Sequence, residues 1–133
     1  MLKTMSFLRI LGLVAASSIN YACITVLLIF WQLDLIPYIL LTLLTSLMIG
    51  TIGADMAKSL FYTISGVAIG TSLGSAIYLA PFSIFGESLQ ATNVASFVLF
   101  SILGKHFLIG LSFYIVGAIA GAFIGENISY RQE

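Results

Sequence analysis

The residues best suited to chemistry in this chain are one basic pair and a set of polar side chains in apolar surroundings. Lys105 and His106 are the only place where a lysine adjoins an imidazole, so they are candidates for proton transfer or for contact with an anion. The second set could line a path for an uncharged or weakly hydrated solute. Its members are Asn20, Thr45, Ser46, Thr71, Ser72, Ser112 and Tyr114.

Both groups also have a structural interpretation, which the sequence favours. A lysine next to the start of an apolar run is commonly an anchor at the membrane surface. Hydroxyl and amide side chains inside such runs form hydrogen bonds between helices, worth about 0.6 kcal/mol each. The basic pair is therefore expected to be an anchor at the outer mouth, and the polar set to hold helices together.

Catalytic and metal-binding chemistry finds little support in the residue types. The single cysteine, Cys23, excludes an internal disulfide and a CxxC site. The single histidine excludes bis-histidine haem ligation and a metal cluster within one chain. No GxSxG motif accompanies the serines. We expect no enzyme activity, no cofactor and no metal, and the zero net charge indicates no nucleic-acid partner.

The composition indicates that lipid, rather than water, is the main solvent. Of the 133 residues, 60% are hydrophobic and only 8% are charged, and the mean hydropathy is +1.14. A soluble domain carries about 25% charged residues. The expected partner is the lipid bilayer, and the expected location is the cell membrane, crossed several times.

Charged residues divide the chain into uncharged runs that are long enough to cross a bilayer, which takes roughly 20 helical residues. No run alternates apolar and polar residues as a barrel strand would. The sequence therefore predicts an all-α bundle of four transmembrane helices in a single domain, 1–133. The predicted spans are about 10–33, 35–54, 59–80 and 106–125, the third ending before Pro81.

Residues 82–104 fit this scheme least well. Only 94–103 are clearly apolar, which is the length of an interfacial or re-entrant segment on the outer side. A fifth span here would have to turn into the next one at 104–106 with almost no loop, so four spans are preferred to five.

Basic residues predict the orientation of the spans. With both termini in the cytoplasm, Lys3, Arg9, Lys58 and Arg131 lie inside and only Lys105 lies outside. A five-span arrangement gives the same balance, so charge does not separate the two topologies.

Two glycine ladders predict packing faces. The segments "GVAIGTSLG" (66–74) and "GAIAGAFIG" (117–125) repeat glycine at every fourth position, which places the glycines along one helix face. Small residues let helix backbones approach closely in lipid. We expect spans 3 and 4 to pack on each other along these faces, as a glycine zipper. The predicted packing residues are Gly66, Gly70, Gly74, Gly117, Gly121 and Gly125, with Gly12 and Ala16 as a weaker version in span 1.

An internal duplication is a further hypothesis. "GLVAASSIN" (12–20) aligns with "GVAIGTSLG" (66–74), and spans 2 and 4 end in "IGAD" and "IGEN". A duplicated two-helix hairpin would cover roughly 6–56 and 59–128. The alternative is chance similarity, because membrane helices are built from few residue types.

The leading functional hypothesis is a non-enzymatic subunit or scaffold that acts through helix–helix association, in a homo-oligomer or a larger membrane complex. On this hypothesis leucine at Gly70 or Gly121 abolishes association, and Asn20→Ala has a mild effect. The alternative is a small oligomeric channel or transporter for an ion or small solute, lined by the polar set. No carboxylate lies within a span, which argues against a proton-coupled antiporter.

Overall fold

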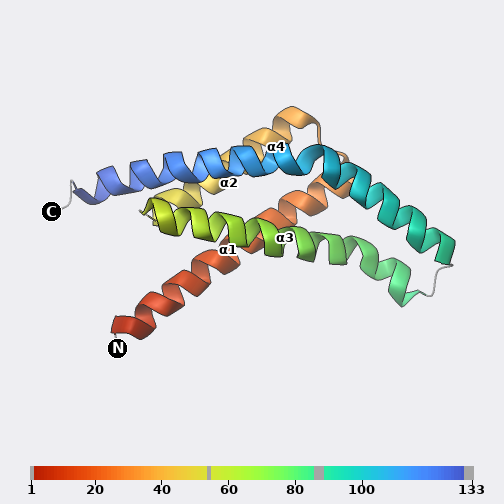
Figure 1. Cartoon of the computed structure of the whole chain (residues 1–133), viewed down its shortest axis with the longest axis horizontal. Helices are drawn as coiled ribbons and strands as arrows, with labels where there is room; N and C mark the ends of the chain where they lie inside the picture. Colours follow the sequence, from red (N-terminus) through yellow and green to blue (C-terminus); the bar gives the residue numbers. More distant parts are fainter. Residues whose placement is uncertain (1, 54, 86–88, 131–133) are drawn as a thin grey trace.

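Four long helices make up most of the chain (Figure 1). The structure is a computed structural model that describes residues 2–53, 55–85 and 89–130, with the side chains of 7–53, 55–85 and 89–128. Every helix contains a stretch long and apolar enough to cross a membrane, and these described residues contain no strand. The prediction of four apolar helices is confirmed at that level. The helices are α1 (Leu2–Trp31), α2 (Leu35–Gly53), α3 (Met56–Ile84) and α4 (Leu89–Tyr130).

Successive helices run in opposite directions (Figure 1). The α1–α2 connection contains Asp34, and we call this end of the bundle the Asp34 end. The start of α1, the end of α2, the start of α3 and the end of α4 lie at the opposite end, which we call the Asp55 end after the residue that precedes α3. On the Asp34 side, the last part of α3 and the first part of α4 extend together beyond the α1–α2 connection.

Local backbone chemistry explains how α1 ends and α3 begins. α1 ends at Trp31 because the next residue, Gln32, takes a left-handed conformation with φ of 46°. Asp55 is the N-cap of α3: its backbone is extended, with φ of −154°, and its carboxylate accepts the Lys58 backbone N–H at 3.1 Å. This hydrogen bond, reinforced by the Lys58 ammonium 3.0 Å away, holds the pKa of Asp55 below its usual value.

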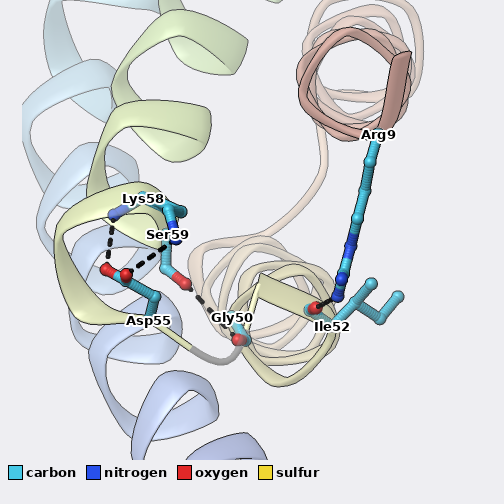
Figure 2. Close-up of polar contacts among 6 residues, drawn as sticks. All are labelled: Arg9, Gly50, Ile52, Asp55, Lys58 and Ser59. Carbon is cyan, nitrogen blue, oxygen red and sulfur yellow. Dashed lines mark hydrogen bonds and ion pairs between the residues drawn. The ribbon is translucent and has the colours of Figure 1, made fainter. Parts of the chain in front are cut away.

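Side-chain contacts to backbone carbonyls join the helices at the Asp55 end (Figure 2). Arg9 of α1 donates from Nη2 to the Ile52 carbonyl oxygen of α2 at 3.0 Å. Ser59 of α3 donates to the Gly50 carbonyl oxygen, also of α2, at 3.4 Å. These contacts satisfy carbonyls near the end of α2 that have no partner within the helix.

One predicted helix end is wrong. Pro81 does not end α3, which continues to Ile84 and is closed by a hydrogen bond from the Phe85 N–H to the Pro81 carbonyl at 3.0 Å. A proline has no backbone N–H and therefore removes one hydrogen bond of the helix. This loss has little effect at Pro81, because α3 ends three residues later at Ile84. The predicted span 35–54 agrees with α2 up to Gly53; Ala54 is outside the described residues.

The described residues of 82–104 are not a segment between two helices but belong to α3 and α4; their position at the outer interface stays a prediction. Residues 82–84 complete α3, residues 89–104 are the first part of α4, and 86–88 lie outside the described residues. Lys105 and His106 interrupt the apolar run without interrupting the helix, so α4 is continuous for 42 residues, roughly 60 Å. The predicted span 106–125 is its second part. Figure 1 shows α4 changing direction about midway.

The glycine ladder of α3 lies against α1, the helix on which α3 packs most extensively. A Cβ added at Gly70 would lie 2.7 Å from the Ser18 carbonyl oxygen and 2.9 Å from the Ala22 backbone nitrogen. One added at Gly74 would lie 2.8 Å from the Thr25 side chain, and one added at Gly66 would overlap Ser17. Only glycine leaves room for this backbone approach.

The ladder of α4 lies in the same way against α2. A Cβ at Gly117 would lie 2.6 Å from the Leu43 carbonyl oxygen. One at Gly121 would overlap the Leu47 carbonyl and lie 2.9 Å from the Thr51 nitrogen, and one at Gly125 would overlap the Thr51 carbonyl. The expectation that spans 3 and 4 pack on each other along their glycine faces is therefore wrong. Each ladder instead meets an earlier helix that presents small side chains.

Gly12 and Ala16 do not contribute to packing within the chain. Both are exposed, and no neighbouring atom lies within 4 Å of a Cβ built at Gly12. Successive residues of a helix are separated by about 100°. α1 therefore turns the face with Ser17, Tyr21 and Thr25 towards its neighbours and leaves the Gly12–Ala16 face outside.

Alanine at the ladder glycines should destabilise the bundle, whereas alanine at Gly12 should not. We expect Gly70→Ala and Gly121→Ala each to lower the free energy of unfolding by about 1–3 kcal/mol, because the added methyl meets backbone atoms. Gly12→Ala should leave it unchanged or raise it by up to about 1 kcal/mol, because the site is open and alanine favours helix. Reversible unfolding in detergent, followed by circular dichroism, measures all three. Equal stability of Gly70→Ala and Gly12→Ala would contradict the packing described.

Candidate functional site

A pocket with a polar mouth opens at the Asp34 end, between the α1–α2 connection and the middle of α4. Its volume is about 460 Å³. Lys105 and His106, the basic pair singled out in the sequence, both line it. Asp34 and Gln32 from the α1–α2 connection and Ser101 from α4 line it too, so the pair shares its pocket with a carboxylate and two neutral polar groups.

His106 is oriented by its own helix and by α2. Its Nδ1 lies 3.0 Å from the Ile102 carbonyl oxygen, and a carbonyl only accepts, so Nδ1 carries the proton of this hydrogen bond. The ring packs edge-to-face on Tyr38 at 5.6 Å between centroids. Nε2 is therefore the ring nitrogen left for a ligand.

Tyrosines from three helices close the bundle beneath this pocket. The Tyr38 hydroxyl donates to the His106 carbonyl oxygen at 3.2 Å and lies 3.5 Å from the Tyr21 hydroxyl. The Tyr21 and Tyr114 rings meet edge-to-face at 5.1 Å, and the Tyr114 hydroxyl lies 3.2 Å from Ser17 Oγ. Tyr21 and Tyr38 are 2% exposed and Tyr114 is 0% exposed. Packed, hydrogen-bonded side chains thus occupy the space where a path through a single chain would run.

The structure does not bring the predicted polar set together. Tyr114 and Ser46 are fully buried, and Thr45 lies within hydrogen-bond reach of Tyr114. Asn20, Ser72 and Ser112 are exposed instead. Most of the hydroxyls donate to carbonyls of their own helix: Thr45 to Leu41, Ser46 to Leu43, Ser72 to Ala68 and Ser112 to Leu108. Thr71 Oγ1 is buried without a hydrogen-bond partner.

Asn20 is exposed near the middle of α1, and no described residue forms a hydrogen bond with its side-chain amide. Asn127 provides a contrast, because its Nδ2 donates to the Phe123 carbonyl oxygen of its own helix at 2.9 Å. Of these two amides, that of Asn20 is therefore the one available to a partner outside the chain.

Sequence reasoning missed Tyr21, Tyr38, Ser17 and Asp34 as members of these sites. A tyrosine in mid-span needs a partner for its hydroxyl, which is a signal for Tyr21. Tyr38 is buried because its ring occupies the space beside Gly110 of α4, where a Cβ would overlap it. No local pattern in the sequence indicates that contact.

Comparison with known protein families, with curated proteins and with solved structures found no match. Within the described part of the chain, no group of three or more His, Cys, Asp or Glu side chains is placed to hold a metal ion. The pocket, the buried tyrosines and the Asn20 amide are the features of this chain that bear on its function.

Removing the Tyr114 hydroxyl should weaken the bundle. In Tyr114→Phe the fully buried Ser17 hydroxyl loses its partner, so we expect the free energy of unfolding to fall by about 1–3 kcal/mol. Tyr78→Phe is the control, because the structure gives the Tyr78 hydroxyl no hydrogen bond among described residues and the ring keeps its contact with Phe30. Its effect should stay within about 0.5 kcal/mol. Denaturation in detergent compares the two, and equal losses would refute the role of the Tyr114–Ser17 contact.

Proposed function

We propose that this chain is a non-enzymatic, membrane-embedded subunit or scaffold that acts through helix–helix association with a second copy of itself. The observation that carries the proposal is the exposed Asn20 amide in the middle of α1, which has no partner among the described residues. The glycine ladders do not supply this association, because they are used between helices of the same chain.

The proposal places all four helices across a cell membrane, with both termini in the cytoplasm. Arg9 and Lys58 then lie at the cytoplasmic end and Lys105 at the outer end, as the distribution of basic residues favours. Arg131 and the Lys3 side chain, which contribute to the same count, are outside the described residues. The duplication of a two-helix hairpin (6–56 and 59–128) stays a prediction.

An unpaired amide in hydrocarbon is unfavourable enough to drive association. Transfer of such a group from water to cyclohexane costs roughly 4–8 kcal/mol, where nothing forms a hydrogen bond with it. An asparagine amide both donates and accepts, so two copies of Asn20 related by a two-fold axis satisfy each other. Ala16 and Gly12 lie one and two turns away from Asn20 on the same helix face, and their small size lets two α1 helices approach.

Replacing Asn20 should weaken self-association without unfolding the chain. We expect Asn20→Leu to weaken the dimer roughly 3–30-fold, which corresponds to one or two interhelical hydrogen bonds of about 0.6–2 kcal/mol in total. Förster transfer between donor- and acceptor-labelled copies in liposomes, at varied protein-to-lipid ratio, measures this. Ser72→Ala is the control, because that exposed hydroxyl already donates to the Ala68 carbonyl. Wild-type association of Asn20→Leu would refute the proposal.

This expectation reverses the one drawn from sequence. Leucine at Gly70 or Gly121 would collide with the chain's own backbone, so its effect on association would follow from unfolding. Asn20 is the residue whose substitution tests association itself.

The second candidate is a small oligomeric channel or transporter for an ion or small solute. It is favoured by the same exposed polar position, since Asn20 would line a path between copies while tyrosines fill the interior of each. As a scaffold, the protein should add no flux of protons, potassium or halide to dye-loaded liposomes. Flux above that of protein-free liposomes, reduced in Asn20→Leu, would replace the scaffold proposal with the channel.

A further inference from the structure

Two opposite charges line the Asp34-end pocket without pairing with each other. The structure records no ion pair between Asp34 and Lys105, and the only one among the described residues joins Lys58 to Asp55 at the other end. Neither the Asp34 carboxylate nor the Lys105 ammonium has a hydrogen-bond partner in the described chain, and both residues are exposed. The pocket thus offers one anionic and one cationic contact to the same ligand.

The remaining lining of the pocket is apolar. Leu28 of α1, Leu35 of α2 and Ile102 of α4 contribute side chains to it. Asp34 follows the uncharged run of α1, and Lys105 precedes the uncharged second part of α4, so the charged mouth lies where apolar helix ends. A ligand that fits has a zwitterionic group at one end and hydrocarbon at the other.

We propose that this pocket binds the head group of a phospholipid that carries a primary amine, as phosphatidylethanolamine does. The phosphate contacts the Lys105 ammonium, and the ammonium of the lipid contacts Asp34. The first acyl carbons lie along Leu28 and Ile102. The volume of about 460 Å³ is within the usual range for small-ligand sites, about 300–1,000 Å³.

The chemistry of the mouth selects a primary amine over choline. A carboxylate accepts hydrogen bonds from an –NH₃⁺ group, whereas a trimethylammonium group has no hydrogen to donate. The neutral Gln32 amide beside Asp34 offers a second acceptor. This binding site does not depend on the proposed association, because Asn20 does not line the pocket.

The test measures lipid retention by the full chain in a non-ionic detergent, using native mass spectrometry with phosphatidylethanolamine, phosphatidylcholine or phosphatidylglycerol added singly. We expect phosphatidylethanolamine to bind roughly tenfold more tightly than phosphatidylcholine, because one charge-assisted hydrogen bond is worth about 1.5–3 kcal/mol. Asp34→Asn should remove this preference. Lys105→Gln should weaken binding of phosphatidylethanolamine and phosphatidylcholine alike.

Lys58→Gln is the matched control, since it removes an exposed lysine at the opposite end. Circular dichroism verifies the fold of each variant, and Lys105→Gln, on α4, provides a test on a second element if Asp34→Asn, in the α1–α2 connection, fails to fold. Equal binding of the two zwitterionic lipids, tighter binding of phosphatidylglycerol, or a preference that survives Asp34→Asn would overturn the proposal. Competition by soluble phosphoethanolamine at the same concentration as the lipid would overturn the lipid source and assign the site to a free amine phosphoester.

Discussion

Direct contact between helix backbones is the interaction on which this structure depends. In lipid, covering one leucine with another gains little, so helices hold together only where their main chains come close. Here that happens along two lines, α3 on α1 and α2 on α4, and in both the glycines of one helix lie against carbonyls and small side chains of the other. The third contact, between α3 and α4, is less extensive and joins the two pairs into one bundle.

The close helix pairs enclose polar side chains, and Thr71 Oγ1 is the one buried polar side-chain atom of the described residues without a hydrogen-bond partner. Tyr21, Tyr38 and Tyr114 extend into the space between α1, α2 and α4, and their hydroxyls find partners there. By contrast, the Asn20 amide and the Asp34 and Lys105 charges have no partner among the described residues and are exposed. These polar groups lie on surfaces that another molecule can reach.

How much of this could be predicted depends on the range of the interaction. Four apolar helices follow from the spacing of charges, because bilayer thickness sets helix length. The division of 82–104 between α3 and α4 does not follow from the spacing of charges. Lys105 and His106 interrupt the apolar run, but they do not interrupt the backbone hydrogen bonds of α4. A glycine ladder predicts which face of its own helix is packed. It does not predict which other helix packs against that face. On α1 the buried face contains Leu13, Ser17 and Tyr21 rather than Gly12 and Ala16, a rotation of about 100° that the small residues of the sequence do not reveal.

The pairing of first with third and second with fourth helix has a consequence for biosynthesis. Neighbouring helices α1 and α2 make few contacts with each other, so the first hairpin leaves the ribosome without its main packing partners. α1 cannot pack on α3, nor α2 on α4, until about 50–70 further residues have been synthesised. This takes several seconds at 5–20 residues per second. During that interval the nascent chain exposes the serine-lined face of α1 and the Gly50 face of α2. Both faces are then open to an insertase or to another nascent copy.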